Sequence, residues 1–566
     1  MAKETAISGS IEIDWIDRDV QIIEGLDHLG IQIVSVNIYG ALLPGITNVT
    51  ERARYFSFYP WVIHRFAKDA PANRTKKIWR EWFRRLDFSY ATACVAYELA
   101  NPDISTGAVV GADAARRLLH DRADGDSINL HNPADVDEKG NIPKTGAYFK
   151  NPEGGFGQYY KNPLKELRVL IDDPEFRYPD VKLTSYAGKA LADALDAQPA
   201  FAQLLHIAEK GRSTPKRLCE IGRDIHPASI VPGDSEESFI RKLLLVGDDE
   251  LSSAQNQEHR EWRSQSFLAM LHFLKDNDGV EDQPDTEFRW TCMAGALQNG
   301  KPWNSESLRP EIIHAWGTYH RNDLLNYSLE VLLAAALGIL KSRSLRPWAL
   351  ADEVAAMALE GSRAGYGGMR IPPAKGPVSR WIETCRRSPK VETEDPWGKG
   401  SSRALFDSLR KAAEDKDYEA AAPLAFCMLG RLATDSGSFK KHPFETIPRA
   451  VALARAYEVH LANWLGRLEK CNSQDIRSFA RELILEWILF RHLRVATRKL
   501  ANQGVSTFKY RVEEGLLVSL PDQKFKPTLT SPRISQAFRM LSDLHFAKSD
   551  GDRLVLTPSG KKIVTT

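Results

Sequence analysis

The most constraining feature of the sequence is the pattern of residues 531–558, near the C-terminal end. Ser531 and Pro532 are typical of a helix start, because serine can cap free N–H groups and proline at the first helical position loses no hydrogen bond. The apolar residues that follow recur at helical spacing: Ile534, Ala537, Phe538, Leu541 and Leu544. This periodicity predicts one helix with a single apolar face. Three polar residues fall on another face: Arg533, Gln536 and Arg539.

A β-hairpin and a closing helix are predicted directly after this helix. The runs 546–548 and 553–556 flank the turn sequence Ser549-Asp550-Gly551-Asp552. A glycine in a short polar turn between two such runs is typical of a hairpin. Thr557-Pro558 then predicts another helix start, by the same reasoning as Ser531-Pro532.

Helix, hairpin and helix in this order resemble the winged helix-turn-helix superfamily, over this C-terminal segment only. The resemblance implies that the helix before the hairpin lies in the DNA major groove, with Arg533, Gln536 and Arg539 as contact residues. The hairpin departs from a DNA-binding wing, because Asp550 and Asp552 would face phosphates. The alternative is a domain that packs only against protein.

A second segment, near 155–196, has a similar pattern. Asn162-Pro163 predicts a helix start, residues 181–184 predict a strand, and residues 185–195 predict a closing helix. Leu183-Thr184 and Gly188-Lys189 echo Leu556-Thr557 and Gly560-Lys561, with one residue more between threonine and glycine. The echo makes this segment a candidate second winged helix.

The strongest basic stripe lies upstream of the C-terminal segment. Arg491, Arg494 and Arg498 repeat at three and four residues, which places three guanidinium groups on one helix face, and Lys499 adds charge beside them. The opposite side is predicted to be buried through Leu483, Ile484, Trp487, Ile488 and Leu489. Since the net charge is only +2, any attraction to nucleic acid must come from such local patches. We therefore predict that the stripe, together with Arg533, Gln536 and Arg539, binds nucleic acid, with duplex DNA as the favoured ligand.

Residues 55–66 form the densest aromatic passage: Tyr55, Phe56, Phe58, Tyr59, Trp61 and Phe66. One interpretation is a stacking surface for bases, with nearby arginines for phosphates. The favoured interpretation is a hydrophobic core, because no glycine-rich or loop context exposes the rings.

The chain has 566 residues, which is far more than one core accommodates, so several domains are expected. The predicted fold class is mainly α and multi-domain, with a C-terminal winged helix, the candidate second winged helix and a helical middle. The expected regions are an aromatic-rich helical region (1–120), the possible winged helix (121–200), a helical middle (201–470) with Gly/Pro linkers near 361–377 and 388–402, and the basic helix with the C-terminal winged helix (471–566).

Neither a signal peptide nor an apolar run of membrane length is apparent, so a cytoplasmic protein without membrane contact is expected. The six cysteines have neither zinc-ligand nor redox spacing. No metal or other cofactor is therefore expected.

Recognisable catalytic motifs are absent from the sequence. Two pairs, Arg455 with His460 and Arg309 with His314, match a loose Arg-x4-His spacing found in some all-helical ribonucleases. The favoured function is a non-enzymatic nucleic-acid-binding or assembly subunit of a larger bacterial complex with protein partners. Winged helices that flank helical segments resemble accessory subunits of genome-maintenance or anti-phage machines. The alternatives are a nuclease with an unresolved active site and a kleisin-like protein-binding scaffold.

Overall fold

The computed structural model describes residues 27–565, except 70–73, 103, 105–107, 176, 247–253, 282, 304–307, 362–365, 367, 388–396, 399, 435–458, 505 and 522–523. The protein is mainly helical, as predicted, and its sheets are small two-stranded hairpins and ladders. The described chain divides into two compact units. Unit 1 comprises residues 27–34, 321–434 and 459–529, and unit 2 comprises residues 35–320 and 530–565. The predicted region 471–566 is thus divided between the units after residue 529.

The following elements belong to unit 2, α1 beginning in unit 1: α1 (Gln32–Leu42), α2 (Tyr55–Asp69), α3 (Lys76–Ala100), α4 (Ala112–Leu119), β1 (Ile128–Asn129), η1 (Phe156–Tyr160), α5 (Lys161–Glu166), β2 (Leu170–Asp172), β3 (Val181–Leu183), α6 (Ala187–Asp196), α7 (Pro199–Lys210), β4 (Arg212–Ser213), α8 (Pro215–Ile225), η2 (Pro227–Ser229), α9 (Ser235–Arg241), η3 (Lys242–Val246), α10 (Ala254–Asp276), α11 (Pro284–Ala294), α21 (Ile534–Asp543), β7 (Ala547–Asp550), β8 (Arg553–Leu556) and α22 (Pro558–Ile563). Unit 1 contains α13 (Pro347–Leu359), α14 (Val378–Arg387), α15 (Ser402–Glu414), α16 (Tyr418–Thr434), α18 (Leu461–Lys470), α19 (Ile476–Leu483), η5 (Ile484–Leu489), α20 (Phe490–Gln503), β5 (Tyr510–Glu513) and β6 (Leu516–Ser519). Helix α12 (Pro310–Leu340) belongs to unit 2 up to residue 320 and to unit 1 beyond it.

The aromatic passage 55–66 forms the core of unit 2, as the favoured interpretation predicted. Every aromatic side chain of α2 is buried. Within this core Phe58 stacks on Tyr90 of α3, with ring centroids 4.2 Å apart. Such buried rings are not available to stack on nucleic-acid bases.

Near the C-terminus, helix, hairpin and helix occur in the predicted order. The hairpin pairs β7 with β8 in antiparallel register from Ala547↔Leu556 to Asp550↔Arg553, and Gly551 turns the chain with a φ of +60°. Helix α21 begins later than predicted, because Arg533, not Ser531, is its capping residue, with a φ of +65°.

Two distant parts of the chain complete this arrangement. Val280, between α10 and α11, exchanges two backbone hydrogen bonds with Leu554 of β8, at 2.8 and 3.0 Å. Phe538 of α21 packs against Phe273 of α10 and Phe288 of α11, with ring centroids 6.4 and 6.3 Å apart. Helices α10, α11 and α21 and the β7–β8 hairpin therefore form one module, which we call module C.

The 155–196 segment also folds as helix, hairpin and helix, through α5, β2–β3 and α6. The turns of this segment and of the C-terminal segment have the same pattern of hydrogen bonds. Arg168 and His545 both have a φ of +58°, and their carbonyls accept hydrogen bonds from the hydroxyls of Thr184 and Thr557. These hydroxyls in turn accept the N–H groups of Gly188 and Gly560, at 2.9 and 3.1 Å.

Glycine is required at both turns because the backbone approaches closely. A Cβ at Gly188 would lie 2.3 Å from the carbonyl oxygen of Val169, and one at Gly560 would lie 2.1 Å from that of Phe546. The sequence echo of Leu-Thr and Gly-Lys therefore reflects a shared local structure.

Unit 1 contains an arrangement that resembles module C. We call it module B, and it consists of the part of α12 in unit 1, α13, α20 and the β5–β6 hairpin. Leu345, between α12 and α13, exchanges two backbone hydrogen bonds with Leu517 of β6, at 2.7 and 3.3 Å. The β5–β6 hairpin follows α20, just as β7–β8 follows α21, and its turn residues Glu514 and Gly515 have φ values of +49° and +77°. The order helix, bridging residue, helix, later helix and hairpin is therefore common to modules B and C.

Helix α12 is long and apolar enough to cross a membrane by length and composition, a feature that the sequence prediction missed. However, 89% of its most apolar 18-residue window is buried inside the protein. Its apolar side chains therefore contribute to the core of the protein.

Candidate nucleic-acid interface

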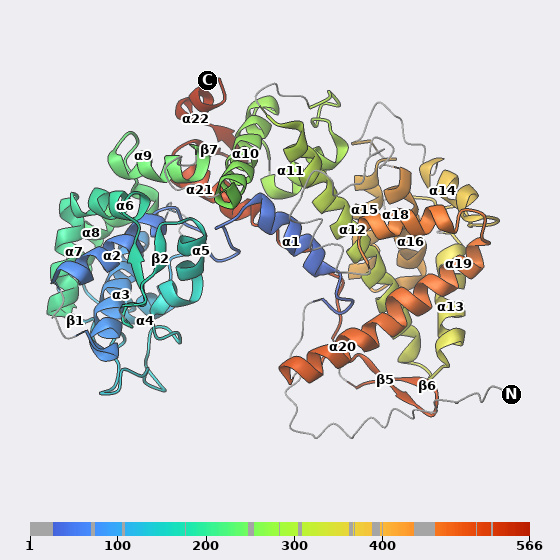
Figure 1. Ribbon diagram of the computed structural model, residues 1–566, viewed down its shortest axis with the longest axis horizontal. Helices are drawn as coiled ribbons and strands as arrows, with labels where there is room; N and C mark the ends of the chain where they lie inside the picture. The colour runs from blue at the N-terminus through green and yellow to red at the C-terminus, as the bar shows by residue number, and fades with distance from the viewer. Residues whose placement is uncertain are drawn as a thin grey trace. The chain divides into compact units, whose positions relative to one another are not determined.

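The predicted basic stripe lies on a long helical run in unit 1, formed by α19, η5 and α20 without a gap (orange in Figure 1). The middle piece, η5, is a π-helix, whose wider turns shift the side-chain register relative to an α-helix. As a result Trp487 is half-buried, although the sequence predicted it inside, and Phe490 is 42% exposed. The other four residues predicted on this apolar side are buried: Leu483, Ile484, Ile488 and Leu489.

Two cations of the stripe bind the protein's own backbone. The Arg491 guanidinium is buried and donates hydrogen bonds to the carbonyl oxygens of Leu29 (2.5 Å) and Gly30 (3.3 Å). The Lys499 ammonium donates to the carbonyl oxygen of Asp27 at 2.9 Å. Both therefore hold residues 27–30 against α20, so substituting Arg491 would disturb the fold as well as any ligand.

Two neighbouring histidines, the half-buried His28 and the buried His492, extend this attachment. The Nδ1 atom of His492 lies 3.2 Å from the His28 carbonyl oxygen, and its Nε2 atom accepts the Lys509 N–H at 3.0 Å. Burial, followed by the nearby lysine charges, lowers the pKa of His28 to about 3. Burial likewise lowers the pKa of His492 to about 4, so both rings are neutral at physiological pH.

Glu330 of α12 is buried beside the same N-terminal segment. Its carboxyl group accepts hydrogen bonds from the Gln32 amide (3.3 Å) and from the Thr528 N–H (3.0 Å). Burial raises the pKa of Glu330 to about 8, which keeps the carboxyl group largely protonated at neutral pH.

The exposed part of the stripe is narrower than predicted and consists of Arg494 and Arg498. With Phe490 they stand at intervals of four residues, which places one side chain about every 6 Å along the same face of α20. Phe490 and Arg494 line a shallow groove together with Glu486 and Trp487. We call Phe490, Arg494 and Arg498 the α20 face.

The carboxylate in this groove is already neutralised. Glu486 accepts an ion-pair hydrogen bond from Arg467 of α18 at 2.8 Å. The same guanidinium lies over the Trp487 ring, 5.1 Å from its centroid. Sequence analysis missed Arg467, because nothing in its own helix indicates contact with η5.

The hairpin beside α20 carries mixed charge. Arg511 pairs with Glu513 on the same strand at 2.5 Å, and Glu514 stands at the turn. An acidic tip does not favour phosphate contact. The α20 face is therefore the more suitable part of module B for an anionic ligand.

The three predicted contact residues of α21 have partners within unit 2. The Arg533 guanidinium lies over the Tyr39 ring, 4.9 Å from its centroid. Gln536 donates a hydrogen bond to the Asn48 carbonyl oxygen at 3.2 Å, and Arg539 forms an ion pair with Glu51. This part of α21 is thus packed against the residues that precede α2.

A buried ion pair secures the same contact. Arg52 donates two hydrogen bonds to Asp543, at 3.0 and 2.7 Å, and the Ala53 N–H donates to the same carboxylate at 3.0 Å. The two side chains are only 3% and 4% exposed. Sequence analysis did not foresee this pair, since its members are almost 500 residues apart.

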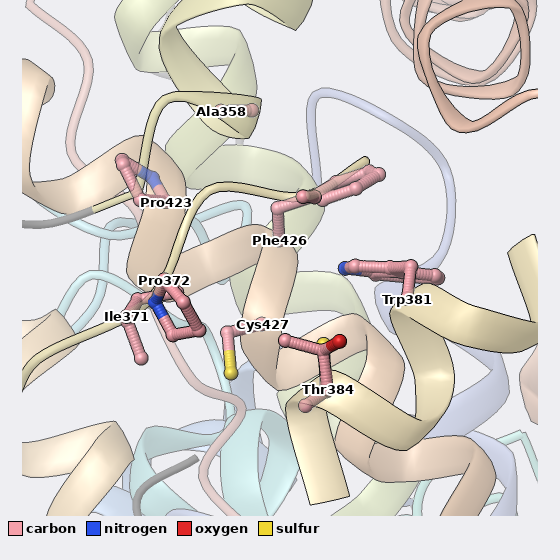
Figure 2. Close-up of a pocket in the computed structure, with 10 residues that line it drawn as sticks. Ala358, Ile371, Pro372, Trp381, Thr384, Pro423, Phe426 and Cys427 are labelled. Carbon is pink, nitrogen blue, oxygen red and sulfur yellow. The ribbon is translucent and has the colours of Figure 1, made fainter. Parts of the chain in front are cut away.

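Two cysteines that are distant in sequence meet in unit 1, although the cysteine spacing had indicated no pair. Cys385 of α14 and Cys427 of α16 line one small cavity and share a hydrogen bond between their thiol groups. Figure 2 shows Cys427 beside Thr384, and Trp381 and Phe426, which line the same cavity, stack on each other. Burial raises the pKa of Cys385 well above its usual value, so its sulfur is a thiol.

The residues considered for a nuclease have structural partners. His460 caps α18 by accepting the Asn463 N–H, and Arg309 forms an ion pair with Glu261. Arg455 lies outside the described residues. Within the described ranges, no group of three or more His, Cys, Asp or Glu side chains is placed to hold a metal ion.

Comparisons of this chain with protein-family models, with curated proteins and with solved structures found no match.

Proposed function

We propose that this protein is a nucleic-acid-binding subunit of a larger bacterial complex, and that modules B and C are winged helices. In module B the contact surface is the α20 face. Duplex DNA is the favoured ligand, and the proposed settings are genome maintenance and anti-phage defence.

The observation that carries the proposal is the arrangement of module B. A residue between two helices pairs with the second strand of a hairpin, and that hairpin follows a later helix. This is the order of elements in winged helix-turn-helix domains, where the helix before the wing enters the major groove. In module B that helix is α20, and it exposes Arg494 and Arg498.

The test is duplex binding by a protein in which both exposed arginines are replaced, Arg494→Ala with Arg498→Ala. Each phosphate contact contributes about 0.9 to the slope of log K against log salt, so the slope should fall by about 2. Affinity for all duplex sequences should weaken alike. A matched control is Arg380→Ala with Arg386→Ala, which removes the same charge from the exposed side of α14.

Arg491 is left intact in this experiment, because its buried hydrogen bonds to residues 29 and 30 make any substitution a folding variant. Circular dichroism verifies that each variant is folded. If the α20 variant and the α14 control bind duplex DNA with the same salt slope as the parent, the proposal is wrong.

A protein-binding scaffold is the second candidate, and the packing of α21 favours it. Gln536 and Arg539 are used for contacts with Asn48 and Glu51, as in winged helices that dock on protein. The scaffold function predicts that Arg539→Ala impairs assembly with partner subunits while duplex affinity stays within twofold of the parent, measured by co-purification and by fluorescence anisotropy.

A further inference from the structure

We propose that the α20 face binds single-stranded nucleic acid, with an unpaired base stacked on Phe490 and the adjoining phosphates held by Arg494 and Arg498. This inference rests on the proposed function and adds a second form of ligand for the same face: a strand that is, at least locally, unpaired.

The aromatic ring is the first element of the argument. Phe490 is 42% exposed at the start of α20, directly after the π-helix η5. A large aromatic side chain loses favourable burial when it stands in water, and π-helical turns occur frequently at functional sites. An exposed ring beside a half-buried Trp487 offers an apolar surface that the flat face of a base can cover.

The charges around the ring favour a nucleotide strand over an apolar partner. Arg494 and Arg498 follow Phe490 at successive four-residue steps, so ring and cations lie in one row. The carboxylate of Glu486, which lines the groove, is paired with Arg467 and adds little repulsion. Aromatic rings interleaved with cations are typical of surfaces that bind single strands without sequence preference.

Duplex DNA would use the two arginines of this row but not the ring of Phe490. In a duplex the bases stack on one another, and their faces cannot reach a side chain without unstacking. The arginines alone would serve a duplex, whereas the ring contributes only when a base is free. Phe490 therefore distinguishes the two ligand forms.

The experiment uses the full chain and labelled homopolymers of about 12 nucleotides, the length range that single-strand sites occupy. Thymidine and uridine strands are compared with a duplex of equal length by fluorescence anisotropy. Two variants separate the effect of an aromatic face from the effect of apolar volume. Phe490→Tyr keeps an aromatic face, and Phe490→Leu keeps apolar volume without one. Leu99→Ala in unit 2 is the control, because it also removes an exposed apolar side chain.

Phe490→Leu should weaken single-strand affinity by about 5- to 100-fold, while Phe490→Tyr stays within about twofold of the parent. Duplex affinity should change less than about twofold in both variants. Similar losses for single strand and duplex, or no loss for either, would overturn the inference and leave the proposed function intact. If the parent protein binds neither single strand nor duplex, both the inference and the proposed function are wrong, and the groove is left as a contact surface for protein.

Discussion

Asp543→Ala is the substitution that most directly tests how α21 is held in unit 2. It removes the carboxylate that receives two guanidinium N–H groups of Arg52 and the backbone N–H of Ala53. Both charged side chains are almost fully buried, so the variant removes the ion-pair partner of a cation in a low-dielectric site. Breaking a buried ion pair in this way costs about 3–5 kcal/mol of unfolding free energy.

Differential scanning calorimetry measures this effect. For a unit of this size, the loss corresponds to a decrease on the order of 4–7 °C in the transition of unit 2, while the transition of unit 1 stays in place. Hydrogen exchange of peptides from α21 and α13 assigns each transition to its unit. The control is Glu220→Ala, which breaks an exposed pair with Arg217 and should cost less than about 1 kcal/mol.

A double variant separates the charge from the loss of packing. Arg52→Met with Asp543→Leu removes both charges and fills similar volume, so it should recover most of the stability lost in Asp543→Ala. The reasoning is wrong if Asp543→Ala unfolds within about 1 kcal/mol of the parent, or if the double variant is as unstable as the single one.

Three further predictions concern other side chains of the two units. Phe538→Ala should destabilise module C by about 3–5 kcal/mol, because the ring packs between Phe273 and Phe288; unchanged melting would mean that the ring is not part of this core. Glu330 keeps its proton in the folded protein up to a pKa of about 8 but loses it near 4.5 when unfolded, so stability should fall as pH rises between these values. Glu330→Gln should therefore match the parent near pH 4 and exceed it above pH 8 by up to about 5 kcal/mol in urea titrations, and a pH-independent difference would contradict the raised pKa. Thr557→Ala removes the cap on the Gly560 N–H and should cost about 1 kcal/mol, whereas Ser559→Ala, at an exposed position of the same helix, should cost less.

Local patterns predicted much of the fold. The apolar period of residues 534–544, the Gly551 turn and the Thr557-Pro558 start gave α21, the β7–β8 hairpin and α22 in the right order. Each of these signals consists of residues inside or next to the helix or hairpin that it specifies. The local sequence is therefore enough to predict that element. The echo between 183–189 and 556–561 was informative for the same reason.

Contacts between distant residues could not be predicted in this way. Arg491 has the same spacing as Arg494 and Arg498, yet it is buried because carbonyl groups more than 460 positions away receive its hydrogen bonds. Trp487 and Phe490 depart from the predicted pattern because a π-helix interrupts the α-helical period. The contact of α11 with α21 in module C could not be predicted either, because Phe538 lies 250 residues beyond Phe288.

The separation of Val280 from Leu554 also matters during synthesis of the protein. The ribosome must add 274 more residues (554 − 280) after Val280 before the strand that pairs with it exists. At about 5–20 residues per second, this delay is roughly 14–55 seconds, far longer than a helix or hairpin needs to form. During most of that interval α10 and α11 have been synthesised, but Phe538, which packs against them, has not. Most of unit 1 is synthesised in the meantime. The nascent chain therefore exposes an incomplete apolar surface that a chaperone can bind, and residues 530–565 close it only after they have been made.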